Sequence, residues 1–329
     1  MSTDDPSPPD RWGERLPRRL GFGSAAAVLV GSTIGSGIFR TPAVVAERLD
    51  VTWLFLGAWL LGGLVAVAGA LTFAELAAMM PRTGGVYVFL RRAYGRPVAF
   101  LFGWTQLLVL RPASYGAISI TCSDYLLRVF GVDGTLVVLG GPSRAQLLAG
   151  ALVVVVGWIN YRGVERGAWV QNVSTVLKIA ALVALVIVGL STLGGGARVE
   201  ATRADAVPLT VLSAFGLAMI PVLWSYDGWS DVVYVSGEVR DPHRVLPRAL
   251  LMGAALVAAL YLAVTLAYLL VVPLSAMPGS ELIAADVASA VIGPVGLVLV
   301  SGAVALSTFG TLNGTMMTGP RIFYAMAED

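Results

Sequence analysis

The sequence contains very few residues of the kinds that bind metals or form disulfide bonds. Its 329 residues include a single cysteine, Cys122, and a single histidine, His243. One cysteine cannot close a disulfide within the chain, and no Cys or His cluster remains to bind a metal. Charged residues are also scarce, at 13%, and the net charge is only +2. These absences argue against a metalloenzyme and against a nucleic-acid-binding protein, so no metal, no cofactor and no nucleic acid is expected as a partner.

Apolar residues dominate instead. They make up 57% of the chain, and the mean hydropathy is +0.80, which is far more apolar than a typical soluble domain. A membrane-spanning helix needs roughly 20 mostly apolar residues. Eight such runs are predicted, at about 21–46, 53–80, 98–127, 145–160, 168–193, 209–237, 246–273 and 285–320. The sequence therefore predicts an all-α polytopic membrane protein.

The arginines indicate how this protein is oriented in its membrane. Lys and Arg close to the ends of spans accumulate on the cytoplasmic side. Here arginines concentrate in residues 1–20 and in the loops after the second, fourth and sixth predicted spans. The first apolar run lacks a small-residue cleavage site, so residues 1–20 are predicted to be a cytoplasmic tail and not a removable signal peptide. We expect a multi-pass protein of the plasma or inner membrane with both ends in the cytoplasm.

Two of the predicted spans contain residues that disfavour a continuous helix. The first span includes Gly31-Ser-Thr-Ile-Gly-Ser-Gly37, and the sixth includes Pro221 followed by Asp227 and Gly228. Backbone that is not hydrogen-bonded cannot face lipid, so both breaks should border a polar cavity. Paired breaks at corresponding spans are typical of secondary transporters built from inverted repeats. Close packing of another helix on Gly31 and Gly35 would be an alternative explanation of the first break alone.

The first break offers hydrogen-bonding groups of both kinds. Free N–H groups at 36–38 begin the second half-helix and would attract a carboxylate. Free carbonyl groups at 32–34 end the first half-helix and would attract a cation. A site with both groups suits a zwitterion such as an amino acid, and glycine would let that ligand touch the backbone.

Six stretches of the sequence, two of which include the helix breaks, match the motifs of one known family in their order along the chain. They are GSTIGSGIF at 31, FAELAAMMPRTGGVYVFLRRAYG at 73, LRPAS at 110, NYRGVERGAWVQNVSTVLK at 160, SYDGW at 225 and EVRDPHRVLPRAL at 238. Together they resemble the amino acid/polyamine/organocation superfamily, in particular its L-type amino acid transporters and bacterial serine/threonine exchangers. The resemblance implies a LeuT-like fold of two inverted five-helix repeats, the first at 21–193 and the second at 209–329. Members usually have twelve spans, so we expect a C-terminally truncated member whose second repeat contains only spans six to eight.

The resemblance also implies a substrate site at the two breaks. The substrate-binding residues that it predicts are Thr33, Ile34, Ser36, Gly37, Ser114, Trp224, Ser225 and Asp227. Ser36 and Gly37 would contact the substrate carboxylate, and carbonyl groups of Thr33, Trp224 and Asp227 would contact its amino group. The Trp224 ring would form a gate over the substrate, unless it only packs within the bundle. The Asp227 side chain would neutralise an amine, take up a proton or, as the sequence favours, cap the next half-helix.

The only lysine, Lys178, lies inside the fifth predicted span. With a rise of about 1.5 Å per residue it lies about 15 Å from the predicted cytoplasmic end of that span, near the bilayer centre. A charge at that depth is usually paired or functional. In the resembling family a lysine here takes the place of sodium, so Lys178 would donate to carbonyl groups near Gly31 and Ser32 and to Ser307 or Thr308. This implies sodium-independent transport, while proton coupling and a purely structural role for Lys178 both stay open.

The sequence therefore predicts a secondary amino acid transporter, either a permease or an exchanger, that acts on small neutral amino acids. The alternatives are a cationic amino acid or polyamine antiporter, a transport-inactive fragment, and an amino-acid-binding sensor of the same fold. An enzyme is not expected, because there is no HExxH motif and no Ser–His arrangement around His243.

Two kinds of partner are expected, namely the amino acid substrate and membrane lipid. Human-type relatives bind a heavy subunit through a cysteine in the loop after the third span. The corresponding loop, at 128–144, contains no cysteine. No disulfide-linked heavy subunit is therefore expected.

Overall fold

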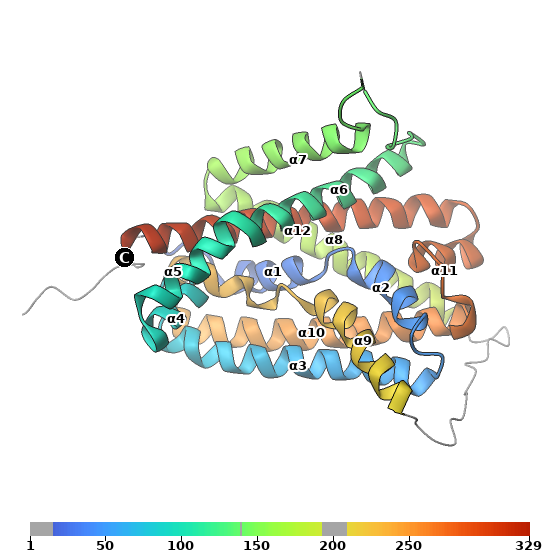
Figure 1. Cartoon of the computed structure of the whole chain (residues 1–329), viewed down its shortest axis with the longest axis horizontal. Helices are drawn as coiled ribbons and strands as arrows, with labels where there is room; N and C mark the ends of the chain where they lie inside the picture. The colour runs from blue at the N-terminus through green and yellow to red at the C-terminus, as the bar shows by residue number, and fades with distance from the viewer. Residues whose placement is uncertain (1–15, 139, 193–208) are drawn as a thin grey trace, which may run out of the picture.

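A computed structural model of the chain describes residues 16–138, 140–192 and 209–329, and helices form its framework (Figure 1). Most of the predicted tail at 1–20 and the connection between the two predicted repeats lie outside the described residues. In chain order the elements are α1 (Phe22–Thr33), α2 (Gly37–Ala46), α3 (Thr52–Met79), α4 (Val86–Tyr94), α5 (Arg96–Thr105), the π-helical η1 (Gln106–Leu110), α6 (Arg111–Val129), α7 (Arg144–Tyr161), α8 (Val164–Leu190), α9 (Leu209–Tyr226), the 3₁₀-helical η3 (Trp229–Glu238), α10 (Pro242–Val271), the 3₁₀-helical η4 (Leu274–Ala276), α11 (Ile283–Ile292) and α12 (Val295–Glu328).

Seven segments of the described chain are long and apolar enough to cross a membrane. They are Phe22–Ala46, Thr52–Met79, Arg144–Tyr161, Val164–Leu190, Val211–Glu238, Pro242–Val271 and Val295–Glu328. These segments correspond to seven of the eight predicted spans. The third predicted span, 98–127, coincides with the consecutive helices α5, η1 and α6. Because α6 contains Arg111, Asp124 and Arg128, it is less apolar than the others, and its crossing of the membrane stays a prediction.

The half-helices α1 and α2 lie in the interior of the bundle (Figure 1). α1 contacts α10, η3, α8 and α12, and 67% of its span is buried, against 17% of the peripheral helix α7. Small residues allow this close packing. A Cβ atom on Gly31 would lie 2.2 Å from the Gln171 side-chain nitrogen and 2.3 Å from the Thr175 hydroxyl oxygen of α8. Gly31 is therefore a helix-packing residue as well as part of the interrupted segment.

The two breaks occur in the predicted spans and at residues that the sequence singled out. α1 ends at Thr33 and α2 begins at Gly37, so residues 34–36 separate the two half-helices. In the sixth span α9 continues through Pro221 to Tyr226, and the chain breaks at 227–228. The segment that follows is a 3₁₀ helix.

Pro221 fails to break α9 because a distant side chain compensates for it. Proline lacks the N–H that would bond to the carbonyl group four residues earlier, which is that of Leu217. The Arg48 guanidinium donates to this carbonyl oxygen at 2.6 Å. The helix therefore continues until Asp227 and Gly228.

The eighth predicted span also has different bounds in the structure. The sequence predicts one span at 285–320, whereas the structure has a short helix, α11, followed by the long helix α12. Gly293, with a φ of 73°, and Pro294 separate them. Glycine readily adopts this left-handed conformation, and proline is favoured at a helix start, so the pair ends one helix and begins the next.

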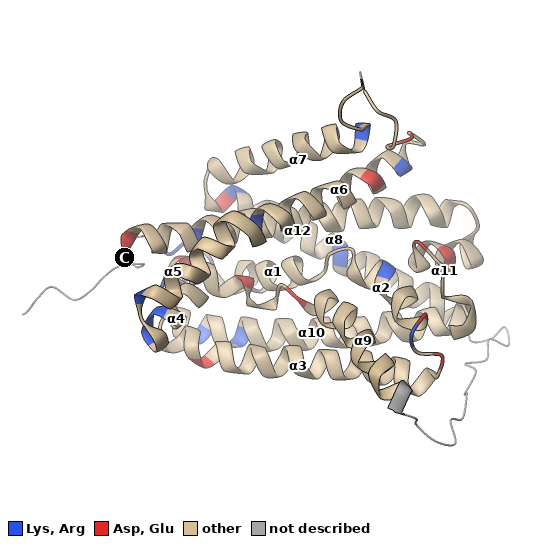
Figure 2. Ribbon diagram, viewed as in Figure 1, with Lys and Arg blue, Asp and Glu red and all other residues tan. Residues whose placement is uncertain are grey.

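Charged residues concentrate near the two ends of the long helices (Figure 2). At the predicted cytoplasmic end, the Arg321 guanidinium lies 2.7 Å from the buried carboxylate of Glu238, and that of Arg19 lies 2.8 Å from Glu165. At the opposite end, the Arg128 guanidinium lies 3.3 Å from the Glu281 carboxylate. The few ionisable groups between these layers lie close to the two helix breaks.

Candidate functional site

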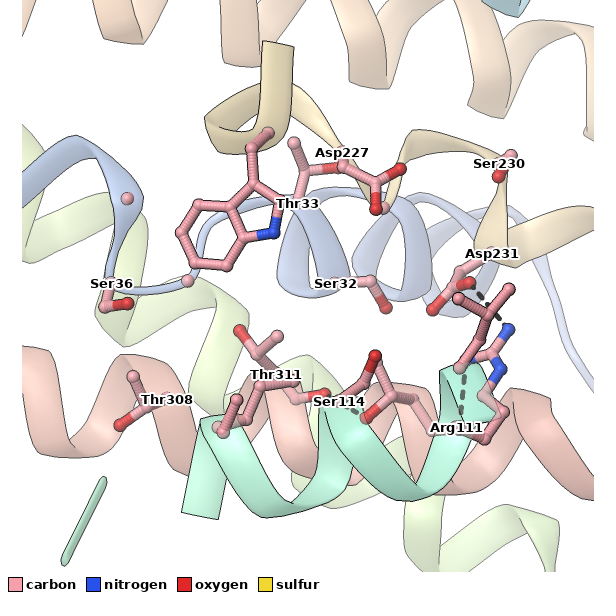
Figure 3. Close-up of a pocket in the computed structure, with 18 of the residues that line it drawn as sticks. Ser32, Thr33, Ser36, Arg111, Ser114, Asp227, Ser230, Asp231, Thr308 and Thr311 are labelled. Atoms are coloured by element: carbon pink, nitrogen blue, oxygen red, sulfur yellow. Dashed lines mark hydrogen bonds and ion pairs between the residues drawn. The ribbon is translucent and has the colours of Figure 1, made fainter. Parts of the chain in front are cut away.

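A cavity of about 470 Å³ lies between the two helix breaks (Figure 3). The first break, the η1–α6 junction, the second break and α12 all contribute to its wall. Its polar and glycine lining residues are Ser32, Thr33, Gly35, Ser36, Gly37, Gln106, Arg111, Ser114, Trp224, Ser225, Asp227, Gly228, Ser230, Asp231, Tyr234, Thr308, Thr311 and Thr315. The predicted polar cavity between the breaks is thus present.

Most of the predicted substrate-binding residues line this cavity. They are Thr33, Ser36, Gly37, Ser114, Trp224, Ser225 and Asp227. Ile34 does not line it, because its side chain is fully buried at the end of α1 and only its carbonyl group is used. The contact of these residues with a substrate stays a prediction.

The start of α2 presents free backbone donors at the cavity. Ser36 is the N-cap of α2, and in the described part of the chain the N–H groups of Ser36 and Gly37 have no acceptor. The first N–H groups of a helix have no partner within it, and the helix dipole adds positive potential there. A Cβ atom on Gly37 would lie 2.8 Å from the Ser225 hydroxyl oxygen, so a larger residue would push the two breaks apart. This corner of the cavity can bind an anionic group.

Two of the three carbonyl groups predicted to bind an amino group are already hydrogen-bonded. The Thr33 carbonyl oxygen accepts from the Gly35 N–H at 2.9 Å, and that of Trp224 accepts from the Asp227 N–H at 3.2 Å. The Tyr261 hydroxyl of α10 lies 3.1 Å from both the Thr33 and Ser225 carbonyl oxygens. It therefore links the two breaks, a role for which the sequence gives one weak signal, namely that a buried Tyr hydroxyl needs a partner.

Asp227 does not cap the helix after the second break. The N-cap of η3 is Gly228, in a left-handed conformation with a φ of 108°, and no side chain caps this helix. The interpretation of Asp227 as a cap is therefore wrong. Its side chain is exposed to the cavity, and it forms no ion pair with the residues that the structure describes. The carboxylate is available to a cationic group in the cavity.

An ion pair forms the end of the cavity away from Ser36 (Figure 3). The Arg111 guanidinium of α6 lies 3.3 Å from the Asp231 carboxylate of η3, and both side chains are 9% exposed. Arg111 also donates to the Gln106 side-chain oxygen at 3.2 Å. The sequence alone does not identify Asp231 as the partner of Arg111. The pair neutralises two buried charges within the wall.

Lys178 is fully buried behind the first break and outside the cavity lining. Its ammonium group donates to the Gly31 carbonyl oxygen at 2.5 Å, to that of Ile34 at 2.8 Å and to the Thr311 hydroxyl oxygen at 2.9 Å. The predicted contact with Gly31 is present. Ile34 takes the place of Ser32 because the chain turns at Ile34, whose carbonyl group no longer follows the α1 axis.

The α12 residue that contacts Lys178 is Thr311, which lies one helical turn after the predicted Ser307 and Thr308. Ser307 donates towards the Ile34 and Gly35 carbonyl oxygens, at 2.9 and 3.0 Å, but does not contact the lysine. The Thr308 hydroxyl bonds to Val304 and Ala305 within its own helix. Residues four apart share a helix face, so Ser307 and Thr311 face the break together. Thr311 also lines the cavity and so connects it to the buried ammonium group.

Two further features are relevant to bound groups. The Ser32 hydroxyl is buried at the cavity and has no hydrogen-bond partner among the described residues, and the sequence did not single it out.

Cys122 is a buried free thiol on α6, with its sulfur 3.3 Å from the Ala305 carbonyl oxygen. Within the described ranges, no three His, Cys, Asp or Glu side chains gather into a possible metal site.

Comparison with known proteins gives consistent matches along the chain. A family model described as amino acid permease matches residues 20–329. The b(0,+)-type amino acid transporter 1 of Mus musculus is 34% identical over 316 residues, which is 95% of this chain and 63% of the relative. The serine/threonine exchanger SteT of Bacillus subtilis is 31% identical over 320 residues, covering 95% of this chain and 69% of the exchanger. The large neutral amino acids transporter small subunit 2 of Homo sapiens is 31% identical over 324 residues, at 96% and 59% coverage. The chain thus spans less than two thirds of the length of the mouse and human relatives.

Proposed function

Since the chain belongs to the amino acid permease family, we propose that it acts as a secondary transporter that exchanges amino acids across the membrane. One observation carries this proposal. The free N–H groups of Ser36 and Gly37 and the carboxylate of Asp227 border the same cavity. These groups complement the carboxylate and the ammonium group of a zwitterion. Transport of such a ligand requires no cofactor and no chemical step.

In this proposal the substrate carboxylate binds at the start of α2. The Ser36 and Gly37 N–H groups donate to it, and the helix dipole favours its charge. The ammonium group lies towards Asp227, whose carbonyl group and carboxylate both border the cavity. The Trp224 ring, which is 63% exposed, is able to move over the bound ligand as a gate.

We propose that this transport is independent of sodium. Lys178 brings a positive charge to the carbonyl groups of Gly31 and Ile34, where a coupled cation would otherwise bind. A second cation beside the ammonium group would be repelled, and the Gly31 and Ile34 carbonyl oxygens already accept from Lys178. Whether Lys178 exchanges a proton during the cycle is a separate question, which the pH dependence of exchange answers.

Small neutral amino acids are the proposed substrates. The Arg111–Asp231 pair at the far end of the cavity carries no net charge, so it selects against neither sign of side chain strongly. Ser114 and Thr308 line the remaining wall and suit a short polar side chain. The names of the bacterial and human relatives, a serine/threonine exchanger and a large neutral amino acids transporter, agree with a neutral substrate.

A cationic amino acid or a polyamine is the second candidate substrate. The observation that favours it is the exposed Asp227 carboxylate, which would attract an additional amine. Under this alternative the Asp227→Asn variant loses exchange of lysine but keeps exchange of serine. Under the neutral-substrate proposal the variant weakens exchange of both to a similar extent.

The proposed setting is a cell membrane, with the end that carries Arg321 in the cytoplasm.

The name of the human relative, a transporter small subunit, raises the question of whether this chain also binds a second subunit. For this chain we propose no disulfide-linked partner, because its single thiol, Cys122, is buried.

Counterflow in proteoliposomes tests the proposal. Vesicles that contain the chain are loaded with unlabelled serine, lysine or buffer, and uptake of labelled serine is followed in sodium or choline medium. We expect saturable uptake that internal serine stimulates and that sodium does not change. Uptake without saturation would indicate a channel, and binding without uptake would indicate a sensor or an inactive fragment.

Two glycine variants link this result to the cavity. Gly37→Leu places a side chain against Ser225 and should abolish uptake. Gly150→Leu is the matched control, because a Cβ atom on Gly150 of α7 meets nothing within 4 Å. If Gly37→Leu retained the affinity of the parent chain, the substrate site would lie elsewhere.

A further inference from the structure

A second cavity, of about 760 Å³, opens at the predicted cytoplasmic end of the bundle. The N-terminal segment before α1, the turn between α7 and α8, and the last turns of α12 surround it. It shares no lining residue with the cavity between the helix breaks. The proposed amino acid exchange therefore makes no use of it.

The charge of this cavity is positive. Its lining contains the four arginines Arg19, Arg162, Arg166 and Arg321 and the two glutamates Glu165 and Glu238, which leaves an excess of two positive charges. Each glutamate already has an arginine partner, since Arg19 lies 2.8 Å from Glu165 and Arg321 lies 2.7 Å from Glu238. Arg162 and Arg166 are the two arginines without an acidic partner among the described residues. They are thus available to an anion.

The geometry around these arginines suits a phosphate group. The guanidinium carbon of Arg162 lies over the Trp158 ring, 4.6 Å from its centre, and this cation–π contact restrains the guanidinium. A fixed guanidinium matches two phosphate oxygens at once. Gly163 and Val164, at the N-terminus of the 27-residue helix α8, also line the cavity and add the positive end of a helix dipole.

Aromatic residues locate the cavity at the level of lipid headgroups. Trp158 and Tyr161, at the last turn of α7, are 56% and 87% exposed. Tryptophan and tyrosine are enriched at the boundary between lipid and water, with their rings at headgroup depth. α7 itself is peripheral, so its outer face is accessible to lipid. Basic pockets between helices on the cytoplasmic side commonly hold acidic headgroups.

We propose that this cavity binds the phosphate group of an anionic phospholipid through Arg162 and Arg166. The bound phosphate lies beside the Arg19–Glu165 and Arg321–Glu238 pairs. The backbone N–H groups of Arg19 and Leu20 donate to the Glu238 carbonyl oxygen, at 2.8 and 2.9 Å, so the same region joins the N-terminal segment to η3 and α12. The lipid therefore stabilises the contacts that join the N-terminal segment to η3 and α12.

Lipid binding to the purified chain in detergent micelles tests the proposal. Dioctanoyl phosphatidylglycerol, dioctanoyl phosphatidylcholine and inorganic phosphate are titrated separately, and the shift in Tm gives each Kd. We expect phosphatidylglycerol to bind more tightly than phosphatidylcholine. The double variant R162Q/R166Q should weaken its binding about 25-fold, from about fivefold for each arginine near the membrane surface.

A matched pair of arginines controls for the loss of charge. Arg244 and Arg248 are exposed on α10 and do not line the cavity. R244Q/R248Q removes the same charge and should leave the Kd for phosphatidylglycerol unchanged within about twofold, because general attraction falls off within a Debye length. If inorganic phosphate binds as tightly as the lipid and loses its binding in R162Q/R166Q, Arg162 and Arg166 form a phosphate site. Its ligand is then a soluble phosphate compound, and the assignment to a phospholipid is overturned.

A gain-of-function variant makes the test independent of folding defects. Glu165→Gln frees Arg19 and removes one negative charge, so it should tighten phosphatidylglycerol binding about fivefold. R162K/R166K keeps the charge but loses the guanidinium contacts to two phosphate oxygens, so its affinity should lie between those of the parent chain and R162Q/R166Q. Equal binding of the two phospholipids, equal losses in both double variants, or no gain in Glu165→Gln would each overturn the proposal.

Discussion

The two helix breaks occupy corresponding spans of the predicted repeats, yet the structure stabilises them in different ways. At the first break, side chains from two other helices converge on free carbonyl groups. The ammonium group of Lys178 contacts Gly31 and Ile34, and the hydroxyl groups of Ser307 and Thr311 contact the same region. This break is thus filled with donors and closed behind the cavity wall.

The second break has much less support from other helices. A left-handed glycine, Gly228, makes the turn, and the Tyr261 hydroxyl is the side-chain donor near the Ser225 carbonyl oxygen. Asp227 and Trp224 both expose their side chains to the cavity. The comparison suggests a division of labour, in which the first break is a fixed frame and the second carries groups that respond to the ligand. Substitutions of the side chains that donate to the first break should therefore affect folding, and substitutions of the exposed side chains at the second break, Trp224 and Asp227, should affect substrate choice.

The largest loss of stability is expected when the first break loses the ammonium group of Lys178. Lys178→Met removes the donor for Gly31, Ile34 and Thr311, and hydrogen bonds to charged groups contribute about 1.5–3 kcal/mol each. Because burial of the charge opposes part of this gain, we expect the free energy of unfolding to fall by about 3 kcal/mol. Denaturant unfolding in detergent measures the loss, and exchange should disappear.

A control on the same helix separates this effect from general damage to α8. Val176 is 66% exposed on the outer face, so Val176→Met should leave both unfolding and exchange unchanged. If Lys178→Met kept full exchange at every pH, the first break would need no buried cation, and the comparison of the two breaks would fail.

The next largest effect concerns the glycines of the two breaks. Gly228 has a φ of 108°, and a Cβ atom there would lie 2.7 Å from the Ser32 carbonyl group. The left-handed backbone alone costs an alanine about 1–2 kcal/mol, so Gly228→Ala should lower the free energy of unfolding by more than about 2 kcal/mol. At Gly35 the nearest atom to a Cβ is 3.6 Å away. Gly35→Ala should thus change stability little, and a reversed order in the Tm values would contradict this description.

A smaller effect should distinguish neighbouring threonines on α12. Thr311→Val removes the hydroxyl group that accepts from Lys178, with an expected loss of about 2 kcal/mol. Thr308→Val removes a hydroxyl group that donates within its own helix and does not contact Lys178, so its effect should be below about 0.5 kcal/mol. Equal losses would show that Thr311 supports the first break no more than any buried threonine does.

The sequence predicted the breaks and the cavity because glycine-rich interruptions of apolar spans have a local cause. It did not predict that α9 continues through Pro221, where Arg48 donates to the carbonyl oxygen of Leu217, a residue 169 positions away from this arginine. Local propensity has no information on such a contact. The same reason explains Asp227, where the alternative cap, Gly228, is defined by the backbone turn.

The partners of buried charges were predictable only in part. Resemblance pointed Lys178 towards Gly31, and the structure has that contact. The choice of Thr311 over Ser307 and Thr308 depends on the rotation and height of α12 relative to α8, which packing determines. Arg111 and Asp231 are 120 positions apart, so their pairing requires the relative position of α6 and η3.

The smallest effect is expected at the Tyr261 hydroxyl group, which joins the two breaks. Tyr261 lies 3.1 Å from the Thr33 and Ser225 carbonyl oxygens, and a hydroxyl group has one proton, so it can donate to only one of them at a time. Tyr261→Phe should lower the free energy of unfolding by about 1 kcal/mol and weaken substrate affinity, because the breaks are no longer coupled. Tyr268→Phe removes a hydroxyl group that contacts only Ile38, so it should cost similar stability and leave affinity unchanged. Denaturant unfolding together with the KM of exchange separates the two variants, and equal KM values would mean that the two breaks act independently.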